Sequence, residues 1–366
     1  IEPTATGHIS EQIEMIKEIM SNGLAYEVNG TVYFDVEKYS KDFNYGQLTN
    51  RKMDELLEGT RELSGQDEKK GRLDFALWIK AKPETLMRWP SPWGWGFPGW
   101  HIECSAMSRK YLGDTFDIHG GGMDLQATHH TNEIAQSQAC YHKTPVNYWM
   151  HTNMLTVNGT RMSKSAGNGF LPGELFTGNH PLLDKGYHPM AVRFFMLQTH
   201  YRSTLDFSNE ALQASEKGYA RLMDSHETLM NLKPSAQSTE NIAQLEASCY
   251  EAMNDDLNTS VLIAHLFEAV RIINSANDGK TSLTAGDIEQ LKKIYQHFIF
   301  DILGLKSDAS DGKSDQALNK VMQIILDMRA QAKADKNFKL SDEIRDKLIA
   351  AGIQIKDSKE GSTWKV

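Results

Sequence analysis

Apolar residues recur at helical spacing from the start of the chain. The stretch from Ser10 to Asn22 is predicted to be an α-helix, because apolar side chains repeat every three or four positions and a glycine follows as a C-terminal cap. The positions concerned are Ile9, Ile13, Ile16, Met20 and Gly23.

The pattern then changes to that of a β-hairpin. Residues 25–28 and 31–36 are rich in β-formers and flank Asn29 and Gly30, and Asn-Gly between such runs is a strong hairpin signal. Residues 53–71 are charged and contain glycines, which predicts a mobile surface loop with a short helix.

Tryptophan, proline and glycine gather between Asp74 and Trp100. We expect most of these tryptophans in a packed core with turns, because large aromatic side chains bury extensive apolar surface. Residues 115–170 then read as short strands, Thr115 to His119 and Met150 to Val157, around a helix from about His129 to Tyr141. This alternation predicts an α/β unit.

Beyond His188 the chain is predicted to be helical, with polar linkers at residues 233–235 and 306–315. Helical patterns cover residues 189–198, 208–231, 240–277, 286–304 and 314–350. Residues 353–355 and 362–364 predict a small terminal hairpin.

Length and composition narrow the class of protein. A chain of 366 residues exceeds one ordinary core, so two or three domains are expected. An apolar content of 40% and a charged content of 24% are ordinary for a globular protein, and no run approaches the ~18–20 apolar residues of a membrane span. The net charge of −9 argues against non-specific coating of nucleic acid, yet allows a local basic surface that meets RNA. Three widely spaced cysteines favour a reducing, cytoplasmic location.

A phosphate-binding loop is the first candidate for chemistry. Arg161-Met162-Ser163-Lys164-Ser165 lies between glycine-containing turns, and its ammonium, hydroxyls and open N–H groups suit a polyphosphate. The alternative is an exposed Ser/Lys loop between two elements.

A metal site is the second candidate. Cys104 is followed 25 positions later by His129, and Glu133 lies one helical turn beyond it. His and Glu at i and i+4 point from one helix face, so with a thiolate they form a plausible zinc shell. His130 is a rival ligand, although the i,i+4 spacing favours His129. The alternatives are a buried core cysteine and a solvated His/Glu pair.

The third candidate is a strand that ends in three glycines. In His119-Gly120-Gly121-Gly122-Met123-Asp124, absent side chains would let a planar or phosphorylated ligand approach the backbone, and Asp124 could accept hydrogen bonds from ribose hydroxyls. A tight turn with a solvated aspartate is the alternative.

Taken in order along the chain, these motifs closely resemble the cysteinyl-tRNA synthetases, a family of class I aminoacyl-tRNA synthetases. The resemblance runs through Trp100 to Cys104, His119 to Asp124, His129 to Glu133 and Met162 to Ser165. It extends to residues 74–78, 200–203, 253–258 and 361–364, and so covers nearly the whole chain.

The resemblance implies an ATP-dependent ligase that forms cysteinyl-adenylate and esterifies cysteine to the terminal adenosine of its cognate tRNA. It implies Cys104, His129 and Glu133 as three of four ligands of one Zn²⁺, which would bind the substrate thiolate and so reject serine. Trp100 would wall the amino-acid pocket with His119 beside it.

The resemblance also implies roles in nucleotide binding. Residues Gly120, Gly121 and Gly122 with Asp124 would hold the adenylate, and Lys164 would stabilise phosphate charge with Mg²⁺ assisting. Arg161 stands where the family usually has lysine.

Anticodon contacts are expected from the C-terminal helices. Lys333, Phe338, Asp342 and Arg345 stand where the family places them, with an aromatic ring for stacking and polar groups for base edges. Phe338 replaces the usual tryptophan; it could instead be a core residue, and Asp342/Arg345 a surface pair.

The implied fold is a partial Rossmann-like class I catalytic domain with a connective insertion, followed by helical stem-contact and anticodon-binding domains. We expect a connective segment at 1–90, the second half of the catalytic domain at 91–160, the signature loop and stem-contact region at 161–210, a helical bundle at 211–305 and a C-terminal tRNA-binding region at 306–366. The partners would be tRNA, ATP and L-cysteine, without a membrane, and the protein a cytoplasmic monomer.

Two family features are not found in the sequence. These are a His-x-Gly-His turn and an amino-terminal cysteine that would be the fourth zinc ligand. We therefore expect that about the first quarter of a typical member is missing, that adenylate formation is lost and that zinc binding is weakened. The rival hypotheses are a paralogous ligase that joins cysteine to an amino sugar and a non-catalytic tRNA-binding fragment.

Overall fold

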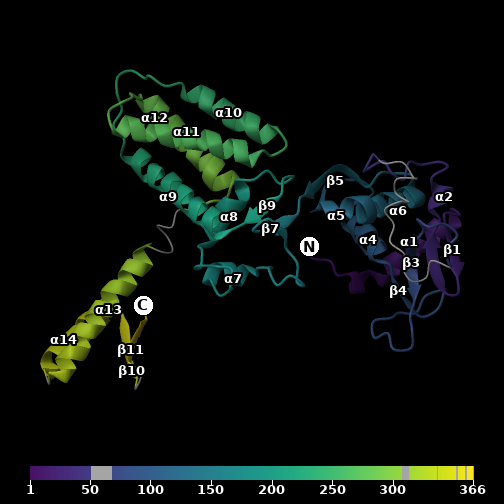
Figure 1. Cartoon of the computed structure of the whole chain (residues 1–366), viewed down its shortest axis with the longest axis horizontal. Coiled ribbons are helices and arrows are strands. Elements are labelled where there is room, and N and C mark those ends of the chain that lie inside the picture. Colours follow the sequence, from purple (N-terminus) through teal and green to yellow (C-terminus); the bar gives the residue numbers. More distant parts are fainter. Residues whose placement is uncertain (51–67, 307–312, 336, 352, 359–360, 366) are drawn as a thin grey trace. The chain divides into compact units, whose positions relative to one another are not determined.

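The computed structural model describes residues 1–50, 68–306, 313–335, 337–351, 353–358 and 361–365 (Figure 1). Contacts divide the chain into two compact units. The first comprises Ile1–Glu216 with Ala252–Ile263, and the second comprises Lys217–Glu251 with Ala264–Val366. The surface loop expected at 53–71 and the linker expected at 306–315 lie largely outside the described residues.

The first unit opens with helix α1 (Ile9–Ser21), as predicted. Its apolar face is buried, with Ile16 and Ile19 fully enclosed. The predicted hairpin is also confirmed: β1 (Ala25–Val28) and β2 (Thr31–Phe34) pair antiparallel across Asn29 and Gly30. Both turn residues have positive φ values, 54° and 89°, which explains why Asn and Gly occupy them.

The hairpin is half of a four-stranded antiparallel sheet. Strand β2 pairs with β3 (Phe75–Lys80), which pairs with β4 (Gly96–Pro98). All four residues of β2 are buried, and the Phe34 ring stacks on Phe75 with centroids 4.8 Å apart. This sheet and α1 share one hydrophobic core.

The prediction that most of the tryptophans are core residues is confirmed for three of the five, because Trp78 lies in the core of the first unit and Trp89 and Trp93 pack, partly buried, against it. Trp78 is fully buried, whereas Trp95 and Trp100 are 59% and 60% exposed. Trp100 begins helix α4 (Trp100–Leu112), which the sequence reading did not anticipate. Gly99 caps α4 where a Cβ would lie 2.1 Å from the Ala76 carbonyl oxygen, so only glycine fits between the helix and β3.

The predicted α/β alternation is present in the next segment. Strands β5 (Phe116–Gly122) and β6 (Val146–Thr152) are parallel. A crossover connects them, and it consists of the short helix α5 (Met123–Leu125), a π-helical turn (Gln126–His130) and α6 (Thr131–Tyr141). The three glycines belong to β5, so the alternative of a tight turn at 120–122 is wrong.

The single strand predicted from Met150 to Val157 is wrong. Strand β6 ends at Thr152, and β7 (Leu155–Val157) belongs to a separate sheet. That sheet also holds β8 (Thr160–Arg161) and β9 (Leu205–Phe207). The chain leaves β6 at Asn153, whose backbone N–H donates to the Tyr201 carbonyl at 2.9 Å instead of continuing the strand.

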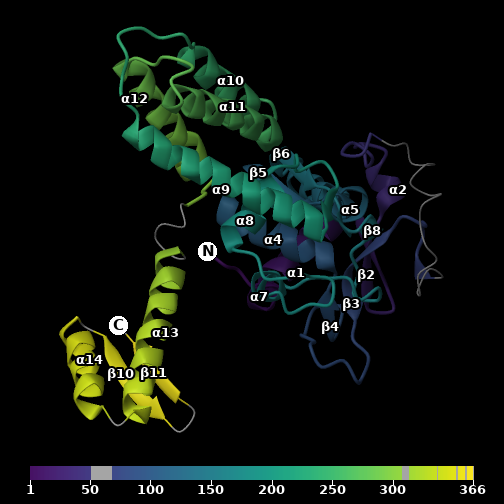
Figure 2. The same ribbon diagram turned by 60° about the vertical axis from the view of Figure 1, so that its left-hand side comes forward.

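Helices predominate after this sheet. They are α7 (Pro172–Thr177), α8 (Pro189–Leu197), α9 (Asn209–Asn231), α10 (Ile242–Asn254), α11 (Thr259–Asn277), α12 (Ala285–Ile294) and the π-helical segment η4 (Tyr295–Ile302). In both Figure 1 and Figure 2, α10, α11 and α12 lie side by side. The pattern at 240–277 forms two helices and not one, because Asp256 and Leu257 adopt left-handed φ values of 54° and 55°.

The C-terminal residues form α13 (Lys313–Ala334), α14 (Phe338–Ala350) and the antiparallel pair β10 (Gln354–Ser358) and β11 (Gly361–Lys365). The terminal hairpin is thus confirmed. The helical pattern at 314–350 is interrupted where Asn337 caps α14, its side chain accepting from the Leu340 N–H at 3.3 Å.

Deleting the Phe34 ring tests this account of the first unit's core. We expect Phe34→Ala to lower the free energy of unfolding by about 3–5 kcal/mol, because the cavity at this fully buried position cannot refill. Urea unfolding followed by tryptophan fluorescence measures it. Leu86→Ala, at a position 98% exposed, is the control and should change stability by less than about 0.5 kcal/mol. Equal effects of the two variants would contradict the core assignment.

Candidate metal centre and signature loop

The proposed zinc ligands come together from three helical elements. Cys104 lies on α4, His129 in the π-helical turn and Glu133 in the first turn of α6. One ligand atom from each lies within 4.8 Å of the other two. The i,i+4 relation expected between His129 and Glu133 is present, with Nε2 and Oε1 3.0 Å apart.

The carboxylate of Glu133 is the unusual group in this cluster. It is 2% exposed, and among the described residues its Oε1 has no hydrogen-bond donor, since His129 Nε2 faces it without hydrogen-bond geometry. Its Oε2 lies 3.6 Å from His119 Nδ1. A buried carboxylate oxygen without a donor is costly unless a cation meets it, so these residues fit a metal.

The Cys104 thiol supports the same interpretation. Burial, together with the neighbouring carboxylates of Glu133 and Glu103, raises its pKa to about 12. Without a cation the thiol therefore stays protonated at neutral pH. A divalent ion would favour the thiolate, which is the ligand form of cysteine.

His101 orients the histidine ligand. Its Nδ1 lies 2.8 Å from His129 Nδ1, and burial lowers its pKa to about 4, so its imidazole is neutral at pH 7. A His129 that binds a metal through Nε2, the atom that faces Glu133, would have its proton on Nδ1 and would donate it to His101. The exposed Trp100 ring covers His129, with centroids 4.3 Å apart.

The rival ligand His130 lies in a second group. His119, His130 and Glu133 also bring ligand atoms within 4.8 Å of one another, without a thiol. His130 Nδ1 is 2.7 Å from His151 Nε2, and burial, with three neighbouring histidines, lowers its pKa to about 3.

The glycines of β5 make room for the protein's own groups. A Cβ on Gly121 would lie 2.6 Å from His130 Cε1, and one on Gly122 would lie 2.3 Å from Asp124 Oδ1. A Cβ on Gly120 would meet only the Met150 carbonyl, at 3.8 Å. The close approach expected of a ligand is thus possible at Gly120, while at Gly121 the histidine cluster occupies the space.

The signature loop, which is the candidate phosphate-binding loop at residues 161–165, forms a closed turn in which Lys164 is exposed. The Asn168 side chain accepts from the Ser163 N–H at 2.9 Å and donates to the Arg161 carbonyl at 3.2 Å. Within the loop the Gly167 N–H donates to the Lys164 carbonyl, and Gly167 has a φ of 63°. Asn168 is 8% exposed, and Lys164 and Ser165 lie at the surface.

Sequence reasoning missed three residues of these sites: His101, His151 and Asn168. His101 had a usable signal, because it precedes Cys104 by three positions and so shares its helix face. His151 and Asn168 had none, since their partners His130 and Arg161 are set by strand pairing and loop closure.

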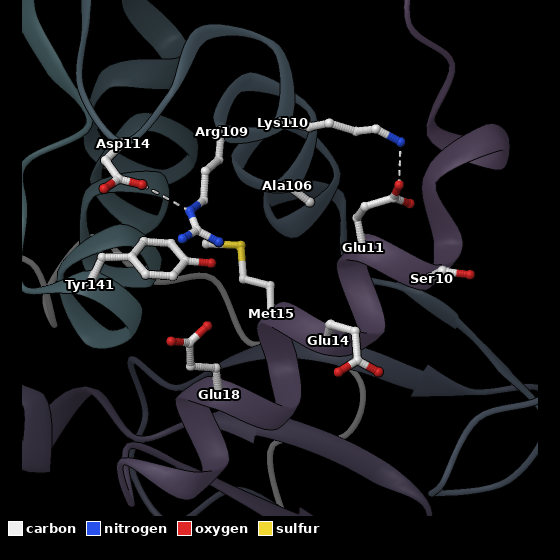
Figure 3. Close-up of a pocket in the computed structure, with 10 residues that line it drawn as sticks. All are labelled: Ser10, Glu11, Glu14, Met15, Glu18, Ala106, Arg109, Lys110, Asp114 and Tyr141. Carbon is white, nitrogen blue, oxygen red and sulfur yellow. Dashed lines mark hydrogen bonds and ion pairs between the residues drawn. The ribbon is translucent and has the colours of Figure 1, made fainter.

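A larger cavity lies away from the metal cluster, between α1 and α4 (Figure 3). It has a volume of about 550 Å³, and its cations are already paired, Arg109 with Asp114 and Lys110 with Glu11. The Arg109 guanidinium lies 3.4 Å from the centroid of the Tyr141 ring. Both cations of the lining are therefore paired with carboxylates of the protein, and Glu18 adds a further negative charge, so the cavity does not suit an anionic ligand.

The proposed anticodon residues lie on α13 and α14, far along the chain from the metal cluster. Phe338 is 62% exposed, so its interpretation as a core residue is wrong. Phe338, Asp342 and Arg345 follow at positions i, i+4 and i+7 of α14, and all three are exposed. Lys333 is an exposed residue of the last turn of α13.

The parallel β5–β6 pair, its helical crossover and the helical segments that follow are those of a class I tRNA synthetase. Residues 1–217 match the family described as tRNA synthetases class I (C) catalytic domain, and residues 248–307 match the DALR domain. Among the described residues, no helix combines the length and apolar character that crossing a membrane requires.

The chain belongs to the cysteine–tRNA ligase family. It is 55% identical to the cysteine–tRNA ligase of Parabacteroides distasonis over 367 aligned residues, covering 100% of this chain and 75% of that protein. The cysteine–tRNA ligases of Bacteroides fragilis and Bacteroides thetaiotaomicron are 54% and 55% identical with the same coverage. The family predicted from the motifs is therefore confirmed.

Asn168 offers a test of the loop geometry. We expect Asn168→Ala to speed tryptic cleavage after Arg161 and Lys164 by about 30-fold, because the loss of two loop-closing hydrogen bonds at about 1 kcal/mol each frees the backbone. Timed digestion with mass spectrometry measures the rate. Asn179→Ala, at an exposed position, is the matched control and should leave it unchanged. An unchanged rate in Asn168→Ala would show that the amide does not hold the loop.

Proposed function

We propose that the chain's chemistry is the ATP-dependent activation of L-cysteine to cysteinyl-adenylate and its transfer to the 3′-terminal adenosine of cysteine tRNA. The observation that carries the proposal is the group of a half-buried Cys104 with the buried His129 and Glu133, joined to membership of the cysteine–tRNA ligase family. The sugar-ligase hypothesis lacks such support, since a sugar acceptor needs no DALR region.

The metal at this group would be Zn²⁺, one per chain. A thiolate, an imidazole and a carboxylate are a donor set that zinc accepts, and softer thiolate donors disfavour Mg²⁺ and Ca²⁺. Zinc would supply a soft Lewis acid that binds the substrate thiolate in preference to the serine hydroxyl. A shape-based pocket could not make this distinction, because the two substrates differ by one atom.

Protein groups around the metal would position the amino acid. His101 holds the His129 ring through their Nδ1 atoms, so that Nε2 keeps its lone pair for the ion. The exposed Trp100 ring stands over His129, where it would wall the amino-acid pocket, and His119 lies on the other side of Glu133.

The nucleotide would be bound by two segments. Gly120 offers its uncovered backbone to the adenylate, and Asp124, exposed on α5, would accept from ribose hydroxyls. Lys164 would face the phosphates of Mg²⁺-bound ATP from the loop that Asn168 closes. Arg161, Met162, Ser163 and Ser165 form the remainder of that loop.

Contacts with tRNA would come from the C-terminal helices. The exposed Phe338 ring can stack on a base, and Asp342, Arg345 and Lys333 can meet base edges or phosphates. The protein would act on these partners in the cytoplasm, as a monomer.

Removing single ligands tests the metal site. We expect Cys104→Ala and Glu133→Gln each to weaken zinc binding by more than about 100-fold, and His101→Ala by about 10–100-fold, the range typical of groups that orient a ligand. Competition with a chromophoric chelator measures the affinity. Cys140→Ala is the matched control, because this buried thiol lies in the core of the same unit. Equal affinity in Cys104→Ala and Cys140→Ala would exclude the assignment.

Amino-acid selectivity gives a second test. With Co²⁺ in place of zinc, cysteine should add thiolate-to-metal charge-transfer absorbance and serine should not, because only the thiol forms a strong bond to the ion. The Cys104→Ala variant should lose the protein's own band. Identical spectra with cysteine and serine would contradict thiolate recognition.

A further inference from the structure

The turn between α10 and α11 is strained at a position that makes several contacts. Asp256 and Leu257 both have left-handed φ values, and for a bulky residue such as leucine this conformation is rare. Strain of this kind persists where surrounding contacts hold it, and it marks candidate functional positions. The contacts here are those of Asp256.

Asp256 holds three consecutive residues of the segment before β9. Its Oδ1 accepts from the Tyr201 hydroxyl at 2.7 Å, and its Oδ2 lies 2.9 Å from Arg202 Nε. Its backbone carbonyl lies 3.1 Å from His200 Nε2. All four residues belong to the first unit.

The same segment is held from its other side by Asn153. The Asn153 N–H donates to the Tyr201 carbonyl at 2.9 Å, and its Nδ2 donates to the Arg202 carbonyl at 2.8 Å. Arg202 is therefore fixed at its backbone by one residue and at its Nε by another. A long side chain held in this way loses less entropy when it binds a ligand.

Arg202 lies at a pocket of about 310 Å³ next to the histidine cluster. The pocket is lined by Leu48, Met123, Gln126, Trp149, His151, Asn153 and Arg202. The Arg202 side chain is 62% exposed, its guanidinium lies 5.6 Å from the centroid of the Tyr201 ring, and within the described part of the chain its terminal NH₂ groups have no hydrogen-bond partner. A guanidinium with its Nε on a carboxylate and its other donors free suits a phosphate, and Trp149 offers a ring on which a base can stack.

We propose that Asp256 is a positioning residue that holds Arg202 to bind a phosphate of the 3′ acceptor end of tRNA in this pocket. The proposal rests on the proposed function, which brings that end to the metal cluster. His151 lines the pocket and contacts His130 of the cluster, 2.7 Å away. No residue of the Lys164 loop lines this pocket.

Binding of cysteine tRNA, with and without its last three nucleotides, tests the proposal on the 366-residue chain. We expect Arg202→Gln to weaken binding of the intact tRNA by about tenfold and to reduce the salt slope of log K by about 0.7, the value for one phosphate contact on a single strand. Binding of the shortened tRNA should be unchanged by the variant.

Asp256→Asn separates positioning from simple electrostatics. It removes a negative charge, so electrostatics alone predicts tighter binding of RNA, whereas the proposal predicts weaker binding of the intact tRNA only. Asparagine tolerates left-handed φ values, which keeps the turn. Asp255→Asn, with the same charge change one residue away, should leave the discrimination between the two tRNAs intact.

Four outcomes would overturn the proposal. The first is equal affinity of the unaltered chain for both tRNAs, and the second is unchanged or tighter binding of intact tRNA by Asp256→Asn. The third is unchanged tRNA binding by Arg202→Gln, and the fourth is that Arg202→Gln loses affinity for ATP instead of affinity for tRNA. If the chain binds neither the intact nor the shortened tRNA, both the tRNA contacts of the proposed function and the role of Arg202 are wrong. If Asp256→Asn loses its circular-dichroism melting transition, the exposed Arg202→Gln variant still decides.

Discussion

The site depends on the burial of one carboxylate. Glu133 is enclosed by imidazoles and a thiol, and the two histidines that flank its partners, His101 and His130, have pKa values lowered by burial. Neither supplies a positive charge at neutral pH. A buried carboxylate is tolerated when it is paired or binds a metal, so the cluster as a whole is arranged for a cation. Burial also raises the pKa of the Cys104 thiol, and a bound cation would stabilise its thiolate in the same way.

The backbone around this carboxylate is built to hold the cluster. The π-helical turn places His129 and His130 side by side before α6, so one faces Cys104 and the other faces His151. Gly121 leaves the space that the His130 ring needs. The end of β6 then passes through Asn153 to the segment that Asp256 holds. A chain of direct contacts thus links the metal cluster to the pocket at Arg202.

Much of the site could be predicted because its signals are local. The i,i+4 spacing of His129 and Glu133 predicted their proximity, and Asn29-Gly30 predicted the hairpin. The family followed from the order of motifs and is confirmed by the relatives.

What could not be predicted depends on contacts between distant segments. The left-handed residues Asp256 and Leu257 divide a continuous helical pattern, and the leucine, which rarely adopts this conformation, gives no signal of the break. Strand β6 ends where Asn153 bonds to Tyr201, 48 positions later in the chain. Trp95 and Trp100 are exposed although Trp78, Trp89 and Trp93 of the same stretch pack in the core, and the residue type alone does not distinguish them.

The most direct measurement is X-ray absorption at the zinc edge of the metal-loaded chain, before and after cysteine is added. The account predicts one sulfur neighbour at about 2.3 Å with lighter N/O neighbours, and a second sulfur once cysteine binds. Serine should add none. A zinc shell without sulfur, or one that cysteine leaves unchanged, would contradict the assignment of Cys104, His129 and Glu133 as the site that recognises the substrate thiol.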